Sequence, residues 1–162
     1  MPLPARALTD GEWRAITPGL AGALRRAGAA PRIVAAAHPA ARIASMWRGS
    51  VPALTRGDEV WWRRAPQDAS KPGLERLMAV LQHELQHVLD YRTGRLSALA
   101  YLSNPANWLY DWSNARSRGW DELGAEQRAS MAEQLWLAER GGAPPGDLAF
   151  LRSRIPWAAD EP

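Results

Sequence analysis

The residues best suited to chemistry form the five-residue pattern HELQH, which holds two of the three histidines in the chain. His83 and His87 stand four residues apart, and Glu84 directly follows the first. In a helix this spacing puts both imidazoles on one face, one turn apart, where both can bind a single Zn²⁺ ion. Glu84 then lies where it can accept a proton from a water molecule that the metal activates. The pattern therefore predicts a zinc site with Glu84 as the catalytic base.

A helix over residues 74–92 is expected to carry this pattern, and Gly94 is well placed to end it. At 100° per residue, its apolar side chains fall on one stripe and the two histidines on the opposite side. The stripe consists of Leu74, Leu77, Met78, Leu81, Leu85, Val88 and Leu89. Asp90 follows His87 by about one turn, and two interpretations remain open for it. It either orients an imidazole through the free ring N–H or is a charge on the exposed side of the helix.

Two histidines and a water leave one coordination position, and the chain has no cysteine to fill it. Glu126 is the favoured third ligand, because it shares one face of a predicted helix over 125–140 with small residues that allow close approach to the histidines. Glu133, two turns further along that face, is either an alternative ligand or a partner that orients a ligand. Glu122 and His38 remain further candidates, although His38 is more typical of a surface position at the end of a strand.

The rest of the chain predicts an α+β fold that is dominated by helices and has a small N-terminal sheet. Hydrophobic residues make up 46% and charged residues 23%, a balance typical of a globular domain. We expect one domain over residues 1–140 and a C-terminal tail over 141–162, with an apolar patch at 148–151 that could pack back. The other predicted elements are a helix from near Asp10 with Thr9 and Glu12 as a capping box, a helix from Pro18 to about Ala27, strands at 32–35 and 58–62, a short helix at 95–103 and an irregular loop at 106–122.

The composition also indicates whether the protein binds nucleic acid or membrane. The net charge is only +3 and the arginines are scattered, so WWRR at 61–64 is a weak indication of nucleic-acid binding. The nine tryptophans are better explained as core residues of a small domain. No apolar run is long enough to span a membrane, and the N-terminus has no leader pattern. We therefore expect a cytoplasmic protein that binds neither nucleic acid nor membrane.

Three segments carry a resemblance to a known group: HELQHVLDYRTG at 83–94, WLYDW at 108–112 and WDELGAEQRASMAEQLW at 120–136. Together with the opening LTDGE, they resemble the small bacterial zincin-like proteins known as Vgr-related or Rhs-associated, over roughly residues 7–137. These proteins accompany type VI and related secretion or toxin loci. The resemblance implies a zincin-like fold, Zn²⁺ bound by His83, His87 and Glu126, and Glu84 as catalytic base. It also implies a peptide or protein substrate and a secretion-system or toxin partner.

The resemblance makes Tyr110 a candidate donor to the oxyanion of a peptidase reaction; the alternative is packing against Trp108 and Trp112. The chain departs from the group's pattern at Asp90, where glutamine is usual, at Gly124, where asparagine would cap a helix, and at Trp112, which replaces a second tyrosine. A zinc metallopeptidase is the function expected. The alternatives are a catalytically inactive zincin-fold adaptor of a secretion apparatus and a metal-free helical protein that binds a partner through its arginines and tryptophans.

Overall fold

The computed structural model of the chain describes residues 5–39, 53–142 and 145–159, and within them the fold is helix-dominated α+β. A four-stranded mixed sheet has the order β1-β2-β4-β3, and only the central β2–β4 pair is parallel. The strands are β1 (Ala5–Ala7), β2 (Arg32–Val34), β3 (Leu54–Arg56) and β4 (Glu59–Trp61). The predicted α+β class is thus confirmed.

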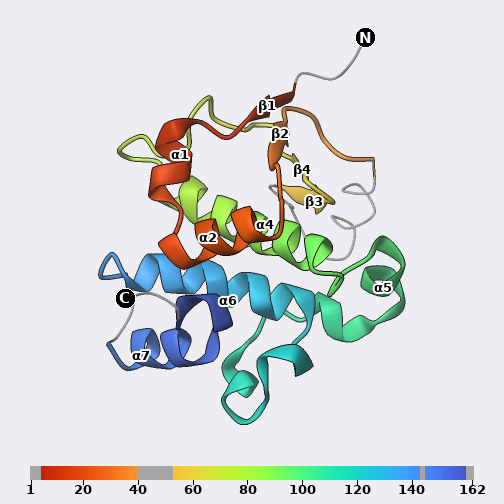
Figure 1. Cartoon of the computed structure of the whole chain (residues 1–162), viewed down its shortest axis with the longest axis vertical. Helices are drawn as coiled ribbons and strands as arrows, with labels where there is room; N and C mark the ends of the chain where they lie inside the picture. Colours follow the sequence, from red (N-terminus) through yellow and green to blue (C-terminus); the bar gives the residue numbers. More distant parts are fainter. Residues whose placement is uncertain (1–4, 40–52, 143–144, 160–162) are drawn as a thin grey trace.

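The helices form layers below this sheet. Figure 1 shows the sheet, α4, α6 and α7 following one another, with α1 and α2 flanking α4 and α5 at the opposite end. The helices are α1 (Asp10–Ala15), α2 (Pro18–Arg26), α4 (Glu75–Arg92), α5 (Ala98–Ser103), α6 (Ala125–Ala138) and α7 (Pro145–Arg154). Short 3₁₀ turns are η1 (Pro105–Trp108), η2 (Ser113–Ser117), η3 (Trp120–Glu122) and η4 (Pro156–Ala158), so the predicted loop at 106–122 is more regular than expected.

The first helix, α1, begins at a capping box formed by Thr9 and Glu12. Thr9 Oγ1 accepts a hydrogen bond from Glu12 N at 3.0 Å, and the Glu12 carboxylate accepts one from Thr9 N at 2.9 Å, as the capping box predicted. The same carboxylate accepts hydrogen bonds from both terminal nitrogens of Arg6 and from Ala69 N. Glu12 therefore joins β1, α1 and the segment that leads into α4, and it is fully buried.

The strand β3 was not predicted, and it is the edge of the sheet that packs on α4. It pairs antiparallel with β4 through a tight turn at Gly57 and Asp58, in which Gly57 has a φ of 60°. A left-handed residue in a two-residue turn favours glycine. This hairpin brings the middle residue of β3, Thr55, over the helix that carries HELQH.

The core surrounds α4. Every residue from Leu81 to Asp90 is buried, so the histidine side of the helix is covered as well as its apolar stripe. Leu151, Ile155 and Trp157 also belong to the core. Residues 145–158 thus pack as part of the domain rather than as a tail. No helix in the described ranges combines the length and the apolar character needed to cross a bilayer.

Candidate metal centre

His83, His87 and Glu126 meet in the contact between α4 and α6. The Oε2 atom of Glu126 lies 3.0 Å from His83 Nε2 and 3.4 Å from His87 Nε2. All three side chains are buried, and one ligand atom from each lies within 4.8 Å of the others. The predicted third ligand is therefore brought to the two histidines, and the group could bind a metal ion.

The spacing of the ligand atoms is compatible with a metal ion in tetrahedral coordination. Metal–ligand bonds of about 2.0–2.1 Å in a tetrahedron separate neighbouring ligand atoms by roughly 3.3–3.4 Å. The observed separations of 3.0 Å and 3.4 Å from Glu126 to the two imidazoles are close to that edge length. Two imidazoles and one carboxylate also match the donor set of catalytic zinc sites, which leave a fourth position for water or substrate.

The charges of the three ligands are mutually dependent. Burial alone would lower the pKa of His83, but hydrogen bonds with Glu126 and Glu133 raise it to about 10. Burial opposes ionisation of Glu126, yet the charge of His87 and the hydrogen bond with His83 hold its pKa well below the usual range. Glu126 is also the second residue of α6, where the helix dipole favours a carboxylate. Without a metal, Glu126 is therefore ionised and His83 keeps a proton, and a bound metal ion would have to displace that proton.

Glu133 and Asp90 have different positions relative to the imidazoles. Glu133 Oε2 lies 3.2 Å from Nδ1 of His83, which is where a partner that orients a ligand belongs. Asp90, by contrast, accepts hydrogen bonds from Arg128 Nε and Gln86 Nε2, each at 2.9 Å. Nδ1 of His87 is buried without a hydrogen-bond partner among the described residues. The predicted contact between Asp90 and an imidazole is thus absent, because a buried arginine from α6 takes that carboxylate instead.

The exposed alternative for Asp90 is also wrong. Asp90 is fully buried, and its partner Arg128 is nearly so. Arg128 further donates to the carbonyl of Leu123, just before α6. This ion pair joins the two helices that carry the candidate metal ligands, so it fixes the relative position of the helices rather than the orientation of an imidazole ring.

Glu84 is held by a residue that the sequence did not single out. Thr55 Oγ1 donates to Glu84 Oε2 at 2.7 Å, and it lies 3.3 Å from the backbone carbonyl of the same glutamate. Glu84 is buried, and its charge contributes to the raised pKa of His83. The carboxylate predicted as a base is therefore beside the ligands, with one oxygen fixed by the edge strand.

Two tyrosines contact the candidate ligands. The Tyr110 ring stacks on the His83 ring with a centroid distance of 5.9 Å and an interplanar angle of 22°. Trp112 stacks on Phe150, with a centroid distance of 6.0 Å and an interplanar angle of 12°. Tyr101, which the sequence analysis missed, donates through its hydroxyl to Glu126 Oε1 at 2.5 Å.

The remaining ligand candidates lie elsewhere. Glu122 is exposed and accepts a hydrogen bond from Gly119 N within its own 3₁₀ turn. His38 packs edge-on against Trp61, as expected for a residue that follows a strand. Among the described residues, the group of potential ligands includes neither of them.

The start of α6 requires glycine at the position where the resembled group has asparagine. A Cβ atom on Gly124 would lie 1.9 Å from the carbonyl oxygen of Ala106 in η1. One capping bond comes from outside the helix, because Asn107 Oδ1 accepts a hydrogen bond from Ala125 N at 3.0 Å. The other comes from the first turn of α6, where Gln127 Oε1 accepts a hydrogen bond from Gly124 N at 3.0 Å. Because Gly124 has no Cβ atom, η1 can pack closely against the N-terminal end of α6, where Glu126 lies.

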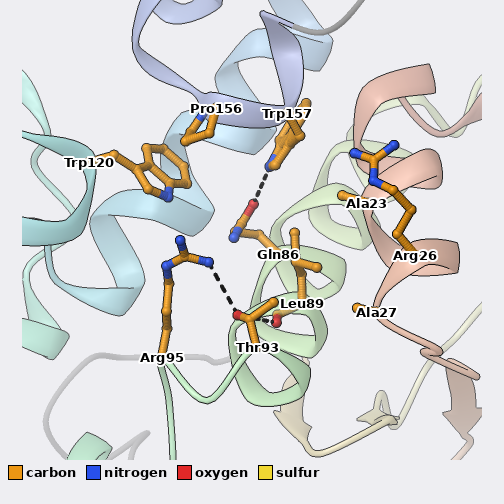
Figure 2. A pocket seen from close by; sticks show the side chains of 10 residues that line it. All are labelled: Ala23, Arg26, Ala27, Gln86, Leu89, Thr93, Arg95, Trp120, Pro156 and Trp157. Carbon is orange, nitrogen blue, oxygen red and sulfur yellow. Dashed lines mark hydrogen bonds between the residues drawn. The ribbon is translucent and has the colours of Figure 1, made fainter.

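A separate pocket of about 360 Å³ lies near the C-terminal end of α4 (Figure 2). Trp120, Trp157 and two arginines line it, and none of the metal ligands does. Gln86 in its wall accepts a hydrogen bond from Trp157 Nε1 while donating to Asp90. This hollow is therefore distinct from the candidate metal centre.

Comparison of the chain with family models, curated proteins and solved structures found no match.

Proposed function

We propose that the protein is a zinc-dependent metallopeptidase with a zincin-like fold. The observation that supports this proposal is the convergence of His83, His87 and Glu126 with the adjacent Glu84 in one buried group. Mixed imidazole and carboxylate donors favour zinc among the common divalent ions when three protein ligands leave one position open. The substrate is then a peptide bond, and the zincin-like sequence pattern supports the same class.

The side chains have distinct tasks in this proposal. Zn²⁺ bound by the three ligands supplies Lewis acidity, which acidifies water and polarises a carbonyl group. Glu84 accepts the proton of the attacking water and returns it to the leaving amine. The Thr55 hydroxyl donates a hydrogen bond to Glu84 Oε2, so Oε1 is the oxygen that accepts the proton of the water. Glu133 orients the His83 ring through Nδ1, and Tyr110 covers that ring.

The test combines metal content with hydrolysis. The purified protein should contain about one zinc per chain by mass spectrometry, and His83→Ala and Glu126→Ala should lose it. Glu84→Gln should retain zinc and lose roughly 10²–10⁴-fold in peptide hydrolysis, the usual contribution of a general base. The exposed Glu122→Gln is the matched control and should change neither quantity. A Glu84→Gln protein that hydrolyses peptides as fast as the parent would refute the mechanism.

A second candidate is a zincin-fold adaptor that binds a partner without turnover. It is favoured by exposed apolar side chains beside the centre, whose exposed fractions reach 77% for Leu99 and 68% for Leu102. Isolated exposed leucines are ordinary, but several within one segment are typical of an interaction surface. The segment contains Leu99, Leu102, Trp108, Leu109 and Tyr110. Zinc bound at full occupancy with no hydrolysis of any peptide in a diverse library would favour this candidate.

A further inference from the structure

The two oxygens of the Glu126 carboxylate have different partners. Oε2 faces the imidazoles, at 3.0 Å from His83 Nε2 and 3.4 Å from His87 Nε2. Oε1 accepts a hydrogen bond from the Tyr101 hydroxyl at 2.5 Å. Because one oxygen accepts this hydrogen bond, the Glu126 carboxylate has a preferred rotation about its Cγ–Cδ bond. The phenol thus selects which oxygen is presented to the histidines.

We propose that Tyr101 is a positioning residue for the metal centre: its hydroxyl fixes Glu126 so that the carboxylate binds the metal through Oε2 alone. This inference rests on the metal-binding part of the proposed function and does not depend on peptide hydrolysis. Tyr101 acts through Glu126 and touches neither the metal nor a substrate. Partners of this kind orient ligands, and their removal typically costs 10–100-fold in metal affinity or activity.

The position of Tyr101 is set by polar contacts rather than by burial of its helix. None of the residues of α5 is buried, so hydrophobic packing does not fix this six-residue helix. Instead, Asn107 Nδ2 donates to Ala100 O at 2.9 Å, and Trp108 Nε1 donates to Tyr101 O at 2.8 Å. These bonds hold the two backbone carbonyl groups that flank the Cα atom of Tyr101.

The same asparagine also holds the other member of the pair. Its Oδ1 accepts the hydrogen bond from Ala125 N, the residue that precedes Glu126. One buried amide therefore connects the backbone next to Tyr101 with the backbone next to Glu126. The close approach of η1 to Gly124 completes this arrangement. Such a specific linkage between an otherwise exposed helix and a ligand-bearing helix fits a positioning role.

The test compares two of the three tyrosines of the chain. Tyr101→Phe removes the hydroxyl and keeps the ring. Tyr91→Phe makes the same change and is the matched control, because the charged group that acts on Tyr91 is Arg56 and not a candidate metal ligand. Zinc dissociation constants are measured by competition with a chromogenic chelator. Tyr101→Phe should weaken zinc binding by about 10–100-fold. Tyr91→Phe should stay within about twofold of the parent, the usual scatter for independent sites.

A double-mutant cycle separates positioning from a general structural role. The Glu126→Ala variant loses zinc on purification, so the affinity of its remaining two-histidine site is measured by titration at zinc concentrations high enough to load it. In this background, Tyr101→Phe should have no further effect on zinc affinity, because the carboxylate on which it acts is gone. The visible absorption of the Co²⁺-loaded protein should also differ between the parent and Tyr101→Phe, since it reports the coordination of the ion.

Three outcomes would overturn the inference. The first is a Tyr101→Phe affinity within about twofold of the parent. The second is an equal loss in the Glu126→Ala background, which would indicate a structural effect unrelated to the carboxylate. In both cases the metal site itself stands. A parent protein that takes up no zinc would overturn the inference and the proposed function together. Zinc binding without hydrolysis would refute only the peptidase proposal.

Discussion

Removal of the Asp90 carboxylate should destabilise the protein far more than removal of an exposed carboxylate. The side chains of Arg128 and Asp90 are 5% and 0% exposed, and the two ions are 2.9 Å apart. Asp90→Ala leaves a buried guanidinium without its counter-ion, which typically costs about 3–5 kcal/mol. With an m-value of about 2 kcal/mol per molar in urea, the unfolding midpoint should fall by roughly 1.5–2.5 M.

The chain offers a matched control and a compensating variant. The Arg95–Asp121 pair is exposed, with 79% exposure of the aspartate side chain, so Asp121→Ala should cost about 1 kcal/mol or less. The double variant Asp90→Leu/Arg128→Met replaces both charges with apolar groups and should recover most of the lost stability. Equal urea midpoints for Asp90→Ala and Asp121→Ala would refute this reasoning, as would a double variant no more stable than Asp90→Ala.

Three further predictions concern other parts of the chain. The pKa of Glu12 is lowered from the ordinary 4.5, since its hydrogen bonds outweigh the opposing effect of burial. Its stabilising contribution is therefore present above pH 4.5 and lost as the pH falls through the folded-state value, and Glu12→Gln should flatten the acid limb of an unfolding profile. Gly124→Ala should destabilise by about 1–3 kcal/mol in thermal unfolding, since its Cβ would overlap Ala106, whereas Gly119→Ala meets only ordinary contacts. Thr55→Val should lower hydrolysis about 10–100-fold with zinc content unchanged; an unchanged rate would contradict its role in holding Glu84.

The parts of the centre that were predictable depend on local spacing. The step of four residues between His83 and His87 fixes their common face in any helix. Glu126 was found because small residues beside it allow a second helix to come close. Both arguments use only the periodicity of a single element, and the structure brings the three residues together as expected.

The contacts that were missed depend on pairings between distant segments. Thr55 lies on a strand whose hairpin could have been predicted from Gly57 and Asp58, since a two-residue turn of this type separates two short β-prone runs. Tyr101 had no comparable signal, because its place is set by an asparagine that binds two helices at once. The role predicted for Asp90 failed because helical periodicity cannot reveal a competing arginine from another helix.

The location of the candidate metal ligands on both α4 and α6 would affect the lifetime of the protein. His83 and Glu126 are 43 residues apart in the chain, so a metal held by both would cross-link the two central helices. Because an unfolded chain loses this arrangement, free metal at about 100 times its dissociation constant would add roughly 2.7 kcal/mol to folding stability. Molecules starved of metal would open more often and be degraded sooner by cellular proteases. Metal supply would then set the abundance of the protein, through selective survival of its loaded copies.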